Sequence, residues 1–109
     1  MRVLTRSVAG CPVLEVQGEV DIDTAPALDD WLTAALDGGA TAIVVDLRRV
    51  GFLDSTGLTV LVRAHKRLAA TSGALDVVVS DEAILRVLSI TGLDTVLRVH
   101  RSLTEALRT

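Results

Sequence analysis

Residues 42–47 have the sequence Ala-Ile-Val-Val-Asp-Leu, and this stretch decides the fold class. The run Ala42–Val45 is wholly apolar, without the polar alternation of a half-exposed strand. Such a run is typical of a strand that is covered on both faces, as in parallel sheets whose crossover helices lie on the sheet. We therefore predict a central parallel strand here.

The segment before this strand predicts a hairpin followed by a helix. Val3–Val8 and Val13–Gln17 have strand-like patterns and are separated by Gly10-Cys11-Pro12, which indicates a hairpin near one edge of the sheet. Thr24, just before Pro26, is a good helix N-cap, and Gly38-Gly39 is a stop signal. The apolar positions between them have helical spacing and comprise Leu28, Trp31, Leu32, Ala35 and Leu36.

The segment after the strand alternates helices and strands. The first predicted element is a helix with the apolar stripe Leu58, Leu61, Val62, His65, Leu68 and Ala69, followed by a strand over Leu75–Val79. Ser80-Asp81-Glu82 opens the next helix, which has the buried stripe Ile84, Leu85 and Leu88, and a strand over Val96–Val99 follows. Ser102 opens the last helix, which buries Leu103, Ala106 and Leu107. The order β-β-α-β-α-β-α-β-α predicts one α/β domain over residues 1–109. It is a mixed open sheet of about five strands and about four helices, parallel after the first hairpin.

Composition excludes several classes of function. The chain has 109 residues, a net charge of -3 and only 2% aromatic residues, so it lacks the basic surface and stacking platforms of nucleic-acid-binding proteins. No uncharged stretch approaches the roughly 20 apolar residues of a membrane-spanning helix. The single cysteine, Cys11, cannot form an internal disulfide, and we expect a cytoplasmic protein. Cys11 is either inert or forms a redox-dependent dimer.

The segment Asp46–Gly57 is the best candidate for a functional site. In open α/β sheets, sites gather where the carboxyl ends of strands meet helix N-termini. Ser55 lies in the turn that opens the following helix, where its hydroxyl can cap that helix. The same place is accessible to solvent, and we expect free backbone N–H groups there to favour an added phosphate.

Three ordered motifs carry a family resemblance. Asp54-Ser55-Thr56-Gly57-Leu58 resembles the phospho-acceptor motif of STAS-domain anti-sigma factor antagonists. Gly18-Glu19-Val20-Asp21, followed by Thr24-Ala25-Pro26, is similar to the motif before the first helix of that family. Ile90-Thr91-Gly92-Leu93 resembles the motif before its last strand. Together the motifs extend over nearly the whole chain.

The resemblance implies a partner switch without catalysis, cofactor or metal. In that family the unphosphorylated antagonist binds an anti-sigma factor, usually a serine kinase, and thereby frees a sigma factor. The kinase uses ATP to phosphorylate the antagonist, and a metal-dependent serine phosphatase reverses the reaction. By motif position the acceptor is Ser55, with Thr56 as the fallback. A phosphate would add negative charge beside Asp54 and the loop of Glu19, Asp21 and Asp23, which weakens binding.

Helical projection at about 100° per residue places Thr56, Thr59, Val60, Arg63 and Arg67 opposite the buried stripe, and we expect the first part of this face to contact the partner. Thr59 and Arg63 stand where relatives often carry small residues, so the partner can differ. The expected partner-binding residues are Asp21, Asp23, Thr24, Asp54, Ser55, Thr56, Gly57, Thr59, Val60 and Arg63.

Two other classes of function remain open. The chain could be a fixed STAS subunit of a stress-signalling or lipid-transport assembly, in which Ser55 only caps its helix. An enzyme has less support. Asp46 follows a strand, as a Walker B or receiver carboxylate does, but the chain has no Gly-x-x-x-x-Gly-Lys-Ser/Thr motif and no acidic pair after its first strand. His65 lies in an apolar stripe, and His100 has no companion metal ligands nearby in the sequence.

Overall fold

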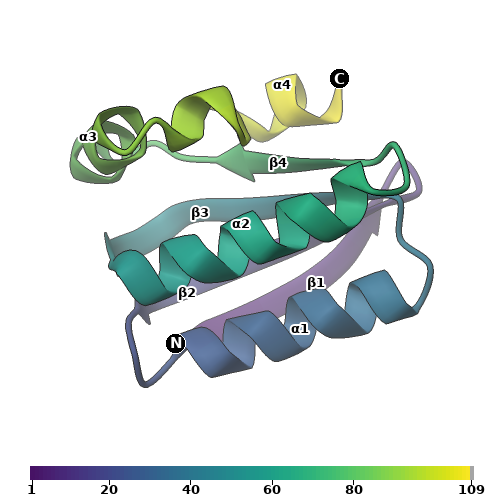
Figure 1. Ribbon diagram of the computed structural model, residues 1–109, viewed down its shortest axis with the longest axis horizontal. Coiled ribbons are helices and arrows are strands. Elements are labelled where there is room, and N and C mark those ends of the chain that lie inside the picture. Colours follow the sequence, from purple (N-terminus) through teal and green to yellow (C-terminus); the bar gives the residue numbers. More distant parts are fainter. Residues whose placement is uncertain (109) are drawn as a thin grey trace.

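The five strands form a single sheet in the order β1-β2-β3-β4-β5 (Figure 1). The structure, a computed structural model, describes residues 1–108. The strands in this range are β1 (Arg2–Val8), β2 (Cys11–Val20), β3 (Ala42–Leu53), β4 (Ala74–Val78) and β5 (Arg98–His100). The helices are α1 (Ala25–Asp37), α2 (Ser55–Ala69), α3 (Glu82–Ile90) and α4 (Leu103–Leu107), with a short 3₁₀ helix over Leu93–Thr95.

The predicted fold class is confirmed. β1 pairs antiparallel with β2, and β2, β3, β4 and β5 then pair parallel in sequence order. β3 is the central strand, as its apolar run indicated. Because each parallel connection passes through a helix, the N-termini of α1, α2 and α3 all follow the carboxyl ends of strands.

Several strands differ in length from the prediction, and β2, at Cys11–Val20, extends beyond the predicted Val13–Gln17 at both ends. β3 continues through Leu53 because it stays paired with β2, with Gln17 opposite Arg49 and Val20 opposite Leu53, across two register irregularities. β3 is therefore longer than the stretch 42–47 from which it was predicted. β5 begins at Arg98 instead of Val96, because Val96 is the C-cap of the 3₁₀ helix and the Leu97 N–H still donates to the Leu93 carbonyl.

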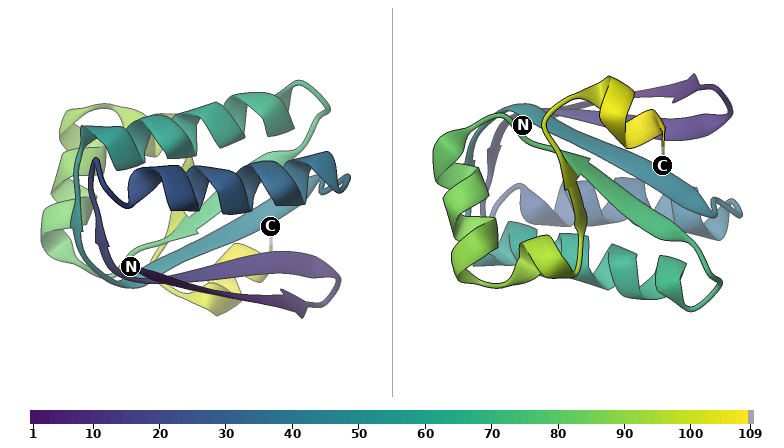
Figure 2. Two further views of the ribbon diagram at one scale, coloured as in Figure 1. Left: turned by 90° about the horizontal axis from the view of Figure 1, so that it is seen from below. Right: turned by 90° about the horizontal axis from the view of Figure 1, so that it is seen from above.

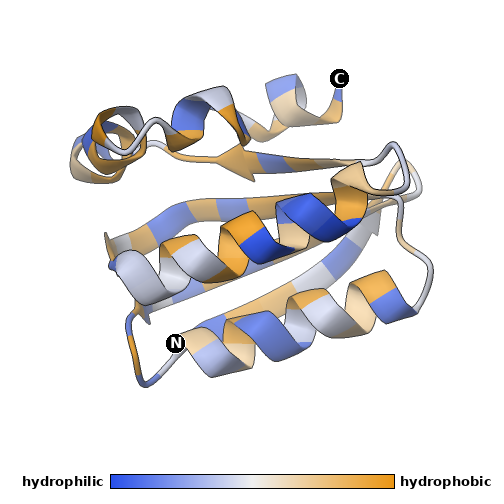
Figure 3. Cartoon of the chain, in the orientation of Figure 1, coloured by the Kyte–Doolittle hydropathy of each residue, from blue (hydrophilic) through white to orange (hydrophobic). Residues whose placement is uncertain are grey.

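Helices cover the two faces of the sheet unequally. α1 and α2 lie side by side on one face, and the short α4 lies on the other (Figure 2). Alternation along β3 sends Val45 and Leu47 into the main core, under α1 and α2. Val44 points the other way, into a small cluster with Val13, Val78 and Ala106 of α4. Figure 3 shows hydrophobic and hydrophilic residues alternating around α1 and α2, as expected for helices with one buried face.

The buried stripe of α2 is shifted toward α1 relative to the prediction. Val60 and Ala64 are only 5% and 3% exposed, so the placement of Val60 on the outer face is wrong. The reason is that α1 packs along the flank of α2, and two ion pairs join the helices: Arg63 to Asp29 at 3.1 Å and Arg67 to Asp37 at 2.9 Å. On the opposite flank, three residues that were predicted to be buried are partly or fully exposed.

The residues at that flank are Val62 and His65, which are half-buried, and Ala69, which is exposed. Trp31 of α1 is also more exposed than predicted, at 44%. It lines a shallow hollow with Thr5 and Leu14 over the β1–β2 hairpin. At the C-terminus the Ser102 hydroxyl accepts a hydrogen bond from the Glu105 N–H, which confirms the predicted N-cap of α4. No helix within residues 1–108 is long and apolar enough to cross a bilayer.

Asp46 is a structural carboxylate in the middle of β3, and not a free group at a strand end. It is 2% exposed and accepts hydrogen bonds from Nε and Nη2 of Arg48 at 2.9 and 2.7 Å. Burial alone raises the pKa of Asp46, but the hydrogen bonds and charge of Arg48, together with the charge of Arg6, bring it below the ordinary value.

This pair predicts a loss of stability in acid. A pKa that is lower in the folded state gives stability that is complete above the unfolded value of about 4 and is lost as pH falls through the folded value. We expect Asp46→Asn to cost about 1.5–3 kcal/mol at pH 7, the range for a hydrogen bond to a charged group. Thermal unfolding at pH 7 and pH 3 measures this cost. A deficit of the same size at both pH values would contradict the assignment.

Candidate functional site

Ser55 is the first residue of α2 and directly follows the turn after β3. Its side chain is exposed, and its hydroxyl makes no hydrogen bond to any other residue within 1–108. Figure 1 shows this helix N-terminus at the same end of the molecule as the loop between β2 and α1. The sheet therefore presents Ser55 at its carboxyl edge, where the sequence predicted a site.

Asp54, and not Ser55, caps α2. The Asp54 carboxylate accepts hydrogen bonds from the backbone N–H of Thr56 at 3.0 Å and of Gly57 at 3.3 Å. The hydroxyl of Thr56 also donates to the same carboxylate oxygen. The hydrogen bond from the Thr56 hydroxyl, assisted by the two backbone N–H groups, lowers the pKa of Asp54, so this cap is an anion at neutral pH.

This cap changes the expected chemistry of the helix N-terminus. We expected free N–H groups that favour a phosphate, but the N–H groups of Thr56 and Gly57 are already occupied by Asp54. The N–H of Leu58 donates to the Asp54 carbonyl. A phosphate on Ser55 would thus meet a carboxylate, and not a set of open donors. The expectation of local stabilisation is wrong, and local repulsion replaces it.

The cap predicts unequal effects of two alanine substitutions. Asp54→Ala removes the acceptor for two backbone donors and should destabilise the protein by about 0.5–2 kcal/mol, the usual range for an N-cap. Ser55→Ala removes a hydroxyl without a partner and should change the free energy of unfolding by less than about 0.5 kcal/mol. Urea unfolding of both variants measures the difference. A Ser55→Ala loss as large as that of Asp54→Ala would reinstate the capping role.

Gly57 is required for the close approach of α2 to the sheet. A Cβ atom at this position would lie 2.4 Å from Cδ1 of Leu53 and 2.8 Å from Cγ1 of Val20. The backbone of Gly57 therefore packs directly on the ends of β3 and β2. Gly57 contributes no side chain to the site, but its close packing on the sheet fixes the positions of Asp54 and Ser55.

The loop between β2 and α1 is held beside Ser55 by its own side chains. Oδ1 of Asp21 accepts from the backbone N–H of Asp23 and Thr24 at 3.0 and 3.1 Å. The Thr24 hydroxyl donates to the Glu19 carbonyl at 2.8 Å and makes no capping hydrogen bond to α1, so the expected role of Thr24 as a side-chain N-cap is wrong. The N–H of Asp54 donates to the Val20 carbonyl at 3.1 Å, which joins the loop to the Ser55 turn.

A groove between the first turns of α1 and α2 adjoins Ser55. Its volume is about 340 Å³. It is lined by Ile22, Ala25, Pro26, Asp29, Thr56, Thr59, Val60 and Arg63. Val60 lines the groove from its buried position between the two helices, and not from the outer face of α2.

Two exposed apolar residues near this end of the sheet were not named for the site by the sequence analysis. Ile22 lines the groove and is 71% exposed, and Phe52, which lies outside the groove near the end of β3, is 50% exposed. An isoleucine between two aspartates in a loop was the available signal for Ile22. Of the expected partner-binding residues, Asp21, Asp23 and Thr24 lie in the loop, Asp54, Ser55 and Gly57 in or next to the first turn of α2, and Thr56, Thr59, Val60 and Arg63 along the groove.

Comparison with known proteins places this architecture in a family. The model of the STAS domain family matches residues 2–106. The chain belongs to the STAS domain family. Within the described residues 1–108, the STAS domain brings no three histidine, cysteine or carboxylate side chains together as a metal site.

Proteins similar to this STAS domain carry a common name. The crystal structure of an anti-sigma factor antagonist from Mycobacterium paratuberculosis has a TM-score of 0.91 and 34% identity, and the match covers 98% of this chain and 91% of that one. An anti-sigma-B factor antagonist of Staphylococcus aureus is 38% identical over 69 residues, which is 62% of this chain and 64% of that protein.

A third relative is the anti-sigma-F factor antagonist RsfB of Mycobacterium tuberculosis, which is 37% identical over 59 residues. That match covers 54% of this chain and 48% of RsfB, so the STAS domain matches about half the length of this relative. The family resemblance inferred from the three motifs is thereby confirmed.

Proposed function

We propose that this STAS domain is an anti-sigma factor antagonist that binds an anti-sigma factor when unphosphorylated and is released by phosphorylation of Ser55. Support for the class comes from relatives that are named as antagonists. The observation that carries the switch is the Asp54 cap. Because Asp54 satisfies the N-terminus of α2, the exposed Ser55 hydroxyl is left without a structural role among the described residues. A fixed structural subunit gives no reason for that arrangement.

Geometry favours Ser55 over Thr56 as the acceptor. A kinase needs the attacking hydroxyl to reach the phosphoryl group of ATP, and the Ser55 side chain is exposed at the sheet edge. Thr56 is half-buried, and its hydroxyl donates to Asp54. Phosphorylating Thr56 would therefore disrupt the cap of α2, whereas phosphorylating Ser55 leaves it in place.

The partner surface in this proposal combines an acidic loop with apolar contacts. Exposed Ile22 and Phe52 supply the apolar area, and Asp23 and Glu19 supply the charge around Ser55. The groove between α1 and α2 takes up a side chain of the partner beside Thr59. The ion pair of Arg63 with Asp29 lines the groove and adds polar specificity.

Release follows from charge at this surface. A phosphoserine carries about -1.5 to -2 charges at neutral pH and would stand beside the Asp54 anion. One unfavourable contact between unit charges at 4 Å costs about 1 kcal/mol in water and about 4 kcal/mol at the dielectric of a protein surface. These values correspond to a loss of affinity of about 5-fold to 1000-fold. The switch then needs no large conformational change.

In this proposal the chain has no catalysis of its own. The anti-sigma factor acts as the serine kinase that transfers phosphate from ATP, and a separate serine phosphatase removes it. All three proteins are expected in the cytoplasm, with neither nucleic acid nor a membrane as a partner of this domain. The antagonist contributes only the exposed hydroxyl and the surface around it.

Mapping the phosphorylated residue tests the proposal. The protein is incubated with the co-encoded kinase and ATP, and peptides are examined by mass spectrometry. We expect one phosphate, on Ser55, which is absent in Ser55→Ala and retained in Thr56→Val. If neither Ser55 nor Thr56 gains phosphate with any co-encoded kinase, the fixed structural role replaces the switch.

A further inference from the structure

Within residues 1–108, the sheet face opposite α1 and α2 is left uncovered over most of β1 and the later parts of β2 and β3. Arg6 pairs with Val13, whose side chain lies in the α4 cluster, so Arg6 is on that same face. Alternation then assigns the neighbouring residues. We define the open face as Arg2, Leu4 and Arg6 of β1, Glu15 and Gln17 of β2, and Asp46, Arg48 and Arg49 of β3. α4 covers only the neighbouring part, around Val44 and Val78.

A β-bulge concentrates arginines on the open face. Between the pairs Glu15–Asp46 and Gln17–Arg49, β3 contains one residue more than β2. Leu47 and Val50 both belong to the main core on the other side of the sheet. Arg48 and Arg49 between them are consecutive and both exposed, which a regular strand with strict alternation does not allow.

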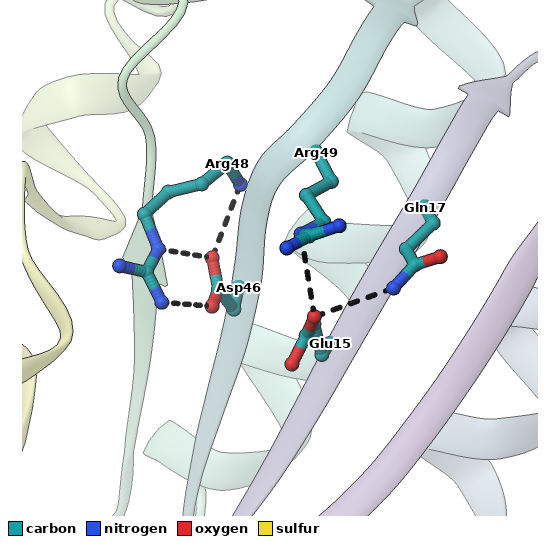
Figure 4. A network of polar contacts seen from close by, with 5 residues as sticks. All are labelled: Glu15, Gln17, Asp46, Arg48 and Arg49. Carbon is teal, nitrogen blue, oxygen red and sulfur yellow. Dashed lines mark hydrogen bonds and ion pairs between the residues drawn. The ribbon is translucent and has the colours of Figure 1, made fainter.

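The Arg48 guanidinium lies beside the Asp46 carboxylate on this face, and Arg49 and Gln17 both contact Glu15 (Figure 4). Arg48 covers the buried Asp46 with two hydrogen bonds, yet its own side chain is 40% exposed. Arg49 is 72% exposed and lies 3.7 Å from Glu15, which also accepts a hydrogen bond from Gln17 at 3.3 Å. Both carboxylates are therefore already bound by residues of the open face. The two arginine side chains remain partly exposed to solvent around a shallow hollow of about 300 Å³.

We propose that the open face binds an acidic segment of a partner protein, at a surface separate from Ser55. Four arginines stand against two carboxylates here, although the whole chain has a net charge of -3. Guanidinium groups pair with carboxylates in a planar, two-bond geometry, and Leu4, 40% exposed among them, supplies apolar contact. Nucleic acid fits less well, because the acidic remainder of the chain repels phosphate chains.

A charge-reversal titration tests this surface. A capped hexaglutamate peptide is titrated into ¹⁵N-labelled protein at low salt, and amide shift changes are followed. We expect shifts confined to residues of β1, β2 and β3 that disappear at high salt. Arg6→Glu with Arg49→Glu should weaken binding about tenfold or more, since each reversal removes at least one exposed ion pair. Arg48 is left intact because it holds Asp46.

The control is Lys66→Glu with Arg86→Glu, which makes the same change in net charge on α2 and α3. It should retain binding within about threefold, because these positions lie away from the open face. Thermal unfolding verifies that both double variants fold. Equal losses in the two variants, shifts mapped elsewhere, or tighter binding of an oligothymidylate to the same face would each overturn the proposal. The protein is tested alone, so the result does not depend on Ser55 or the anti-sigma factor.

Discussion

Ser55→Asp is expected to weaken binding to the cognate anti-sigma factor by about 5-fold to 1000-fold. The range follows from one unfavourable charge contact of about 1–4 kcal/mol across an interface. Asp54 is an anion next to this position, and its carboxylate is held in place by Thr56 and Gly57. A second carboxylate at position 55 would therefore stand beside a fixed one, and both charges would lose water when the partner covers them. Isothermal titration calorimetry measures the affinity.

Two control variants separate charge from other causes. Ser55→Ala removes the hydroxyl without adding charge and should bind within about threefold of the wild type. Ser72→Asp makes the same change in net charge beyond the other end of α2, where an exposed residue with φ of 61° tolerates aspartate. It should also retain binding. Equal affinities of Ser55→Asp and Ser55→Ala would refute the electrostatic account of release.

Gly57→Ala is expected to destabilise the fold by about 1–3 kcal/mol, the usual cost of overpacking. The new methyl group would lie 2.4 Å from the Leu53 side chain and 2.8 Å from that of Val20. Leu53 can rotate away in part, but Val20 is fully buried and β-branched, so it has little freedom to move. This steric cost exceeds the helix propensity that alanine adds, which is at most about 1 kcal/mol.

The structure provides a matched control for this variant. Gly51 lies in β3 with no atom within 4 Å of a Cβ added there, and its φ is not positive. Gly51→Ala should change the melting temperature little, whereas Gly57→Ala should lower it by about 4 °C or more. Gly57→Ala should also weaken partner binding, because the turn that carries Ser55 must shift outward. A normal melting temperature for Gly57→Ala would contradict the close packing of α2 on the sheet.

The fold was predictable because its signals are local. The apolar run Ala42–Val45 specifies a buried strand, Gly38 ends α1, and the Asp81 carboxylate caps the N-terminus of α3. The length of β3 was not predictable, because residues 48–53 stay in the sheet through pairing with β2, which a single strand does not encode. Burial of Val60 depends on the neighbouring α1 in the same way.

The site was predictable in position but not in its hydrogen bonds. The motif Asp54-Ser55-Thr56-Gly57 located the helix N-terminus within one residue, yet either Asp54 or Ser55 could have been the cap. Only the backbone conformation decides between two adjacent capping residues. The groove beside Ile22 arises where α1 and α2 meet, so it has no signature in either helix by itself.

The most direct test of the proposed switch is the affinity of the same anti-sigma factor for the unphosphorylated and the Ser55-phosphorylated protein. Mass spectrometry verifies complete modification at Ser55, and calorimetry measures both dissociation constants under one set of conditions. We predict a rise of the dissociation constant of at least about fivefold on phosphorylation, from one charge contact of 1 kcal/mol or more. Dissociation constants that are equal within twofold would contradict the proposed switch.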